Sequence, residues 1–530
     1  MKFPVWQLAF LCLFFYSFNL FSSTTDVYSL LSIDKATLSR EQSGKFARLC
    51  VDYNGRICPL QTLAMDFTTK LVGKPKYKYA NAEQVFLGWI FFPDKWQHVP
   101  FFDIKSPEMK ALINSSGKAC FADFFNQDKS YKLTRYQQQM YSSDKQSGFI
   151  KEALKLDEKI QLIAMLQSGG LLRMFPVQMQ DSNIRWLSPV DSFPETVSKQ
   201  DVLIAQNFFS LYYECIKTGN VEEASVILDK LAIYQQNNAY GTLPSQTHLK
   251  AELLYNKVNI FSLLFKVNLL LGCLGLFFFI FSLVKKNEIK KVCEFFYFLL
   301  IISFVFQILG LALRAYIAGR IPMSNGYETM LFIAWCALLI GVLGRRYSFL
   351  IVCFSFLLSG FTLLVAHIGS MNPQITSLVP VLQSPLLSIH VSFIMISYGL
   401  CGFMFLNSVA SFVLKAFAPH AAETDSSVLM MKELSELFMF PAAFFMGIGI
   451  FIGAIWANVS WGRYWGWDPK EVWALITFIL MSFSFHGKTI RWFNKPLVYH
   501  IFILLIFASV LMTYFGVNYI LGGKHSYGGG

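Results

Sequence analysis

The chain has 530 residues, of which 54% are hydrophobic and 17% aromatic, but only 15% are charged. Soluble proteins carry roughly 25% charged residues, so this composition excludes an ordinary soluble protein and indicates a membrane protein. The net charge of +12 does not indicate a nucleic-acid partner, because no basic run contains interleaved readout residues and many cations flank apolar segments.

Residues 1–25 predict an export signal. Met1-Lys2 precedes an apolar run from Val5 to Phe21, and Ser22-Ser23-Thr24-Thr25 follows it. This order is typical of a signal peptide, which is either cleaved or kept as an N-terminal anchor. In both cases the next segment, 26–257, is expected outside the cytoplasm.

Residues 26–257 have the mixed composition of a soluble domain, and their periodicity predicts a mostly helical fold. Polar and apolar residues alternate at helical spacing over 151–166 and 221–235. The second of these helices is expected to form a hairpin with a helix over 201–217, through a turn at Thr218-Gly219-Asn220.

The ten cysteines do not form a haem-attachment or redox motif, because the sequence contains neither CxxCH nor CxxC. The chain is therefore not itself a c-type cytochrome. Outside the cytoplasm a disulfide between Cys50 and Cys58 is an open alternative.

From residue 258 to the end, the chain is a series of apolar stretches. A helix needs roughly 20 apolar residues to cross the hydrocarbon core of a membrane. By this criterion 258–292 holds a connecting transmembrane helix and a cytoplasmic turn, and 293–530 forms a polytopic membrane domain, which makes the fold class all-α. The eight predicted spans are 260–284, 293–313, 327–343, 348–368, 388–416, 436–456, 471–487 and 497–517.

The cations between the spans predict the orientation in the membrane. With the soluble domain outside, the cytoplasmic loops hold ten cations and the outer loops and tail hold five, as the positive-inside rule requires. The loop 457–470 and the C-terminal tail are then outside. The ten are Lys285, Lys286, Lys290, Lys291, Arg345, Arg346, Lys432, Lys488, Arg491 and Lys495, and the five are Arg314, Arg320, Arg463, Lys470 and Lys524.

The segment from Trp456 to Trp473 holds five of the eleven tryptophans in eighteen residues. An aromatic belt at the membrane surface is one interpretation, although a belt rarely gathers so many in one loop. Gly462 and Gly466 allow close approach of the backbone to a flat partner, and Asp468-Pro469 predicts the start of a helix. We interpret the loop as a rigid aromatic shelf for a large planar ligand.

Two histidines expected on the same side of the membrane as the tryptophan loop indicate which planar ligand the loop binds. His390 is expected at the outer end of its span and His525 in the outer tail, so both flank the tryptophan loop. Imidazole nitrogen is a common ligand of haem iron. His367, near another outer span end, is a rival for His390, and His486 is expected near the cytoplasmic end of the span after the loop.

These motifs resemble a known family. The pattern Trp461-Gly-x-x-Trp465-x-Trp467-Asp468-Pro-Lys-Glu-x-Trp473-x-Leu475 is similar to the signature (WWD) of tryptophan-rich haem-handling proteins. It is most similar to the CcsA family, the haem-handling half of the CcsBA (System II) cytochrome c synthase. The resemblance covers roughly 294–527. It continues in Pro322-Met-Ser324-Asn325-x-Tyr327-Glu328-Thr329, in Pro380-x-Leu-Gln383-Ser384 leading to His390, and in Gly516-Val-Asn518 leading to His525.

The resemblance implies a role for each matching residue. His390 and His525 match the axial ligands of haem b held outside, and His486 matches a ligand within the membrane on the path of haem from the cytoplasm. The expected platform for haem consists of Trp461, Gly462, Trp465, Trp467, Asp468 and Trp473. Arg314, Arg320 and Arg463 are candidates for contacts with the haem propionates, and anchoring to lipid headgroups explains them equally well.

The resemblance also implies a function in cytochrome c maturation. The chain would bind haem at the outer face of a bacterial cytoplasmic membrane, export it, and present it to the CxxCH of apocytochrome c as a component of a haem lyase (holocytochrome c synthase). Expected partners are apocytochrome c, a thiol-reducing protein and a ResB/CcsB-like membrane protein. The alternatives are a System I-type haem lyase or haem-delivery protein, a b-type electron-transfer subunit, and a transporter with an aromatic gate.

Overall fold

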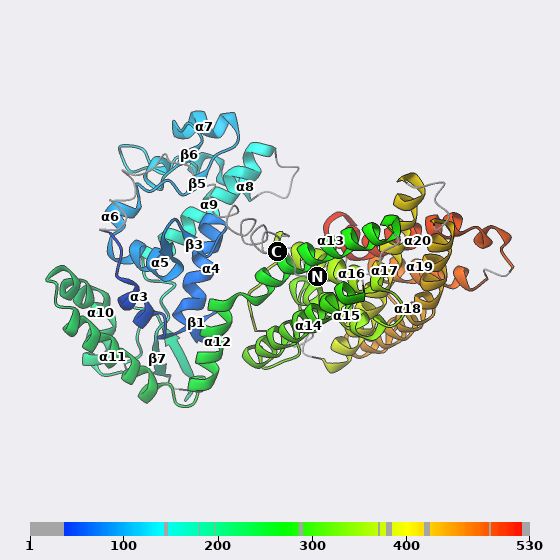
Figure 1. The fold of residues 1–530 in the computed structure, drawn as a ribbon. Coiled ribbons are helices and arrows are strands. Elements are labelled where there is room, and N and C mark those ends of the chain that lie inside the picture. The colour runs from blue at the N-terminus through cyan, green and yellow to red at the C-terminus, as the bar shows by residue number, and fades with distance from the viewer. Residues whose placement is uncertain are drawn as a thin grey trace. The chain divides into compact units, whose positions relative to one another are not determined.

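The computed structural model describes residues 36–141, 147–179, 181–195, 197–285, 290–368, 371–377, 384–417, 424–486 and 489–521 (Figure 1). They form two compact units that divide after Leu249. The predicted boundary at 257/258 falls at the end of helix α12 (Gln246–Val258), which crosses this division. The predicted signal or anchor at 1–25 lies outside the described residues.

The N-terminal unit consists mainly of helices, with four two-stranded antiparallel sheets among them. The sheets pair β1 (Cys50–Tyr53) with β2 (Arg56–Pro59), β3 (Lys76–Tyr77) with β4 (Ala80–Asn81), β5 (Phe102–Asp103) with β6 (Lys118–Ala119), and β7 (Phe175–Gln178) with β8 (Ile184–Leu187). The helices before α12 are α3 (Arg40–Phe46), α4 (Leu60–Val72), α5 (Ala82–Phe91), α6 (Pro93–Trp96), α7 (Pro107–Ile113), α8 (Gln137–Met140), α9 (Gly148–Gln167), α10 (Lys199–Lys217) and α11 (Val221–Asn238).

Helices α9, α10 and α11 confirm the three helices that were predicted at 151–166, 201–217 and 221–235. Helix α10 begins at the N-cap Ser198 and α11 at the N-cap Asn220, and both caps accept a backbone N–H of the first turn. The two helices form the predicted hairpin through Thr218-Gly219-Asn220, where Gly219 has a φ of +76°. Each buries one apolar stripe, so packing of that face stabilises the pair.

The register of β1 and β2 decides the open question of Cys50 and Cys58. Cys50 pairs with Pro59, whereas Cys58 pairs with Val51. Neighbouring residues of a strand point to opposite faces, so the two cysteine side chains leave the ribbon on opposite sides. This geometry does not fit a disulfide between them.

The second unit is a bundle of long apolar helices. Among the described residues, seven helices are long and apolar enough to cross a membrane: 246–282, 290–318, 326–344, 349–368, 385–417, 424–461 and 496–521. The corresponding elements after α12 are α13 (Ile260–Lys285), α14 (Lys290–Ala318), α15 (Gly326–Gly344), α16 (Phe349–Ile368), α17 (Pro385–Phe417), α18 (Thr424–Trp461) and α20 (Pro496–Leu511), which continues into a π-helix, η6 (Met512–Leu521).

The eighth predicted span, 471–487, corresponds to α19 (Pro469–Phe483), which has 15 residues and is followed by a 3-10 turn, η4 (Ser484–His486). Its length is below the roughly 20 residues that a straight crossing needs. The count of eight spans therefore stays a prediction.

Glycines allow α17 and α18 to pack closely along their length. A Cβ atom at Gly449 of α18 would lie 2.6 Å from Cδ1 of Ile394 on α17, and one at Gly453 would lie 2.6 Å from the ring of His390. Both distances are shorter than real contacts of a Cβ atom. The side chains of Ile394 and His390 on α17 thus fit against α18 because residues 449 and 453 of α18 are glycines.

Candidate functional site

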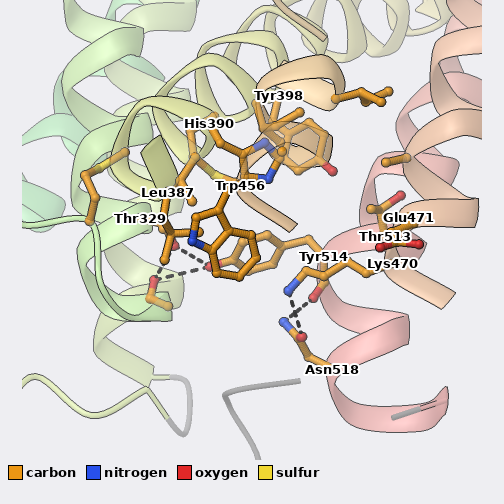
Figure 2. A pocket seen from close by; sticks show the side chains of 18 of the residues that line it. Thr329, Leu387, His390, Tyr398, Trp456, Lys470, Glu471, Thr513, Tyr514 and Asn518 are labelled. Carbon is orange, nitrogen blue, oxygen red and sulfur yellow. Dashed lines mark hydrogen bonds between the residues drawn. The ribbon is translucent and has the colours of Figure 1, made fainter. Parts of the chain in front are cut away.

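A cavity of about 460 Å³ lies in the second unit, between α15, α17, α18, α19 and η6 (Figure 2). Its volume falls in the range of binding sites for small molecules, and apolar and aromatic side chains provide most of its walls. The apolar lining includes Met323, Met371, Leu387, Val391, Ile394, Met395, Ile450, Ala454, Trp456, Ala457, Trp465 and Ala474.

His390 contributes an imidazole to the cavity from the second turn of α17. Its Nδ1 lies 2.6 Å from the carbonyl oxygen of Gly449 on α18. A carbonyl oxygen only accepts hydrogen bonds, so Nδ1 carries the proton and donates it, and the lone pair of the neutral ring is on Nε2. A hydrogen bond of this kind from Nδ1 to a backbone carbonyl is what orients metal-binding histidines. The backbone of α18 therefore holds His390 in the tautomer that ligates through Nε2.

The tryptophan loop is fixed at both of its ends. Helix α18 ends at Trp461, and Gly462, with a φ of +72°, turns the chain while its N–H donates to the carbonyl of Asn458. Asp468 caps α19, with Pro469 at the first helical position, as the sequence predicts. Glu471 completes this cap, and its Oε2 accepts N–H groups of Gly466 and Asp468 at 2.8 and 3.2 Å.

The predicted aromatic platform divides into two groups. Trp456, which is buried, and Trp465 line the cavity together with Tyr464. Trp461 and Trp467 are instead 47% and 75% exposed, and the ring of Trp467 meets that of Trp465 edge to face at 6.1 Å. Trp473, on α19, is partly buried, and its carbonyl accepts the hydroxyl of Thr477. Of the predicted platform tryptophans, Trp465 thus lines the same cavity as His390. Trp456, which the predicted platform did not include, lines it as well.

The surroundings of Arg314 indicate a role in holding the fold together and not in binding a ligand. Its side chain is fully buried and pairs with Glu328 of α15 at 2.9 Å. It also donates to the backbone carbonyls of Pro373 and Gln374 and to the hydroxyl of Tyr255. These acceptors attach the segment 371–377 to α14, and this segment contributes Met371 and Asn372 to the cavity.

The other two predicted arginines also lie outside the cavity lining. Arg320 donates to the carbonyl of Thr376 at 2.7 Å and to the hydroxyl of Ser324. Arg463 is exposed, and its guanidinium lies against Gly466, where a Cβ atom would be 3.0 Å from it. The proposed propionate contacts of the three arginines stay predictions, and the geometry adds no support to them.

The charged side chains that do line the cavity are Lys470 and Glu471, neither of which the sequence singled out. Nζ of Lys470 donates to Oδ1 of Asn518 on η6 at 3.2 Å. Burial lowers the pKa of Lys470, an effect that the nearby carboxylate of Asp468 opposes. The signals available for Lys470 were its place within the tryptophan-rich pattern and in the first turn of the helix that begins at the end of the tryptophan loop.

Two hydroxyl groups, from α15 and from η6, line the cavity. The hydroxyls of Thr329 and Tyr514 lie 2.6 Å apart, and Tyr514 also donates to the carbonyl of Gly326 (Figure 2). Asn518 donates to the carbonyl of Tyr514 from the same π-helix. π-Helices are rare and occur frequently at functional sites.

The other described histidines of the second unit lie outside the cavity lining. His486 is exposed in η4, and His367 is exposed and stacks on Phe265 of α13 at 5.0 Å. His500 of α20 is buried, with its ring nitrogens 3.0 and 2.9 Å from the hydroxyls of Ser408 and Ser411. His525 lies outside the described residues. Of the described histidines, His390 alone lines the cavity.

Comparisons with known proteins give the family. Residues 323–525 match the family described as "Cytochrome C assembly protein". Over 514 residues the chain is 34% identical to Protein NrfI of Wolinella succinogenes. This match includes 93% of the chain but 55% of NrfI, so the chain spans about half the length of that relative.

Two relatives called cytochrome c biogenesis protein CcsA match part of the chain. That of Chlamydomonas reinhardtii is 32% identical over 248 residues, with 43% of this chain and 66% of CcsA covered. That of Arabidopsis thaliana is 30% identical over 288 residues, with 43% of this chain and 84% of CcsA covered. The multi-pass chain therefore belongs to the cytochrome c assembly protein family, together with CcsA and NrfI.

Proposed function

We propose that the second unit binds haem b in the cavity, with His390 as an axial ligand, and presents it for covalent attachment to the CxxCH of an apocytochrome c. The observation that carries this proposal is the imidazole of His390, which stands in an apolar, aromatic cavity with its Nδ1 held by the carbonyl of Gly449. An oriented imidazole in an apolar pocket is what haem requires of a protein. Membership of the cytochrome c assembly family supports haem as the ligand.

The residues of the cavity would position haem and not react with it. Trp456 and Trp465 provide flat apolar surfaces for the porphyrin, and Nε2 of His390 provides the bond to iron. His525, which follows the π-helix η6 in sequence, would supply the second axial ligand. Orientation of two reactants is by itself a large contribution to a reaction rate.

In the proposed attachment, each cysteine S–H of the CxxCH adds across one vinyl group of haem. One C–S bond forms at each vinyl carbon next to the ring, and the thiol hydrogen ends on the outer vinyl carbon. The addition needs no oxidant, but it needs both thiols reduced, which explains the thiol-reducing partner. The histidine of the CxxCH would then replace one of the two axial ligands.

We further propose that the cavity faces the periplasm and that haem reaches it from the cytoplasmic side by way of His486. The distribution of cations between the spans supports this orientation. His486 is exposed in η4, the 3-10 turn that follows α19. A second histidine from a ResB/CcsB-like membrane partner could complete an inner haem site there.

Co-expression of the chain and its partner with an apocytochrome c tests the function. The measured quantity is the amount of cytochrome that carries covalent haem. We expect the variant His390→Gly to abolish it and the matched variant His367→Gly, which removes an exposed histidine outside the cavity, to leave it unchanged. Full attachment by His390→Gly would contradict the proposal.

A further inference from the structure

One carboxylate holds the two peptide groups that follow Trp465 and Trp467. Oε2 of Glu471 accepts the N–H of Gly466 at 2.8 Å and the N–H of Asp468 at 3.2 Å. The first N–H belongs to the peptide bond after Trp465, and the second belongs to the peptide bond after Trp467. Hydrogen bonds to a carboxylate are stronger than those between neutral groups. Glu471 therefore restrains the backbone on both sides of Trp467.

The backbone of Trp467 is strained and depends on such a restraint. Its φ is +55°, in the left-handed region that favours glycine and is rare for a bulky residue. A residue keeps this conformation only where the surrounding structure enforces it, and residues of this kind cluster at functional sites. Without the two bonds to Glu471, we expect residue 467 to relax to a negative φ, which would change the path of the loop on both sides of it.

The conformation of Trp467 affects the cavity through its neighbour Trp465. Trp465 lines the cavity, whereas Trp467 is 75% exposed and meets the ring of Trp465 edge to face at 6.1 Å. Glu471 lines the same cavity from the first turn of α19 (Figure 2). Relaxation of residue 467 would therefore move the ring of Trp465, which is one of the flat surfaces proposed for the porphyrin.

We propose that Glu471 is a positioning residue of the haem site, which holds Trp467 in its strained conformation and thereby places the ring of Trp465 against haem. The inference rests on the proposed function, since Trp465 would be a wall for the haem that His390 ligates. Glu471 is also the third residue of α19 and completes its cap, so loss of the cap is the competing explanation for any effect of a variant. The two explanations differ in one respect, because positioning alone depends on the strain at residue 467.

A double-mutant cycle between residues 471 and 467 separates the two explanations. Purified full-chain variants in detergent are titrated with haem, and binding is followed by absorbance. We expect Glu471→Ala to weaken haem binding about tenfold, the effect of losing a charge-assisted hydrogen bond, and to shift the absorbance spectrum. In a Trp467→Gly background this loss should nearly disappear, because glycine adopts a positive φ without strain. In a Trp467→Ala background it should persist, because alanine lacks the same ring but keeps a Cβ atom.

Glu223→Ala is the matched control, because it removes the glutamate at the third position of α11, where the N-cap is Asn220. It should leave haem affinity unchanged. An equal loss from Glu471→Ala in the wild type and in both backgrounds would overturn the inference in favour of the cap. The absence of any loss from Glu471→Ala would overturn it as well. In either case haem binding through His390 would still stand.

Folding provides the second readout of the same cycle. If Glu471→Ala does not fold, Trp467→Gly should restore its folding and Trp467→Ala should not, as melting temperatures in detergent would measure. Failure of Trp467→Gly to restore folding would overturn the inference. Failure of the wild type to bind haem would instead contradict the proposed function.

Discussion

The imidazole of His390 occupies the space that a side chain at residue 453 would fill. A Cβ atom at Gly453 would lie 2.6 Å from both Cε1 and Nδ1 of the ring, and the hydrogen bond of Nδ1 to Gly449 comes from the same face of α18. The position of the proposed iron ligand on α17 therefore depends on a missing side chain of α18.

The first prediction concerns this space. Gly453→Ala should displace the ring of His390 and break its bond to Gly449, so haem affinity should fall at least about tenfold, the effect of losing one oriented ligand contact. Alanine is favoured over glycine in a helix by up to about 1 kcal/mol, so the helix itself should remain folded. Haem affinity and the absorbance spectrum of the purified protein measure the effect.

Gly399→Ala on α17 is the matched control. A Cβ atom there would lie 3.7 Å from Cβ of Cys336, an ordinary contact, so haem binding should not change. If Gly453→Ala bound haem with the affinity and spectrum of the wild type, the space at residue 453 would have no role in placing His390.

The second prediction concerns the buried pair of Arg314 and Glu328. Removing one partner of a buried ion pair leaves an uncompensated charge and costs about 3–5 kcal/mol. Arg314→Gln should therefore lower the melting temperature of the protein in detergent, and it should weaken haem binding because the segment 371–377 loses two of its anchors.

The double variant Arg314→Gln, Glu328→Gln should be less destabilised than the single variants together predict, since it leaves no unpaired charge. Arg463→Gln should have almost no effect on melting, because this side chain is exposed. Strictly additive effects in the double variant would exclude coupling between the two residues.

The third prediction concerns the N-terminal unit at high pH. The hydroxyls of Tyr131 and Tyr141 donate to the two oxygens of Asp157, a carboxylate that is 1% exposed. Burial and the bond to Asp157 raise the pKa of Tyr131, and the bond to Asp157 and burial raise that of Tyr141. Since the folded pKa values are raised, this contribution to stability is fully present below about pH 10, the ordinary tyrosine pKa, and is lost as the pH rises beyond it.

Thermal unfolding of the full chain, followed by near-ultraviolet circular dichroism at several pH values, measures this loss. The variant Tyr131→Phe, Tyr141→Phe should be less stable than the wild type near neutral pH, but its melting temperature should fall less steeply above about pH 10. The same slope in both proteins would show that these tyrosines do not determine the alkaline loss.

The sequence predicts those features that depend on local pattern. The hairpin of α10 and α11, the cap at Asp468 and the long apolar helices each follow from spacing or from residue types at helix ends. The place of His390 beside part of the tryptophan loop follows from the order of the spans. The spacing of apolar residues did not reveal that α19 has only 15 residues, because apolar residues continue into the turn after it.

What the sequence did not predict depends on contacts between distant segments. Gly453 matters only because α18 packs against α17, and Lys470 reaches the cavity only because η6 lies beside α19. Arg314 looked like a surface cation at the end of a span, since nothing in its neighbourhood identifies Glu328 or the carbonyls of 373 and 374 as its partners. Pairings of this kind follow from tertiary packing alone.

The most direct test of the account is chemical rescue of the proposed iron ligand. Replacement of His390 by glycine leaves a hole the size of an imidazole, which free imidazole can fill. We predict that purified His390→Gly protein carries little haem, and that adding imidazole during expression restores both the haem and the wild-type absorbance spectrum. A His390→Gly protein that holds as much haem as the wild type, with an unchanged spectrum and no response to imidazole, would contradict the claim that His390 binds haem iron in this cavity.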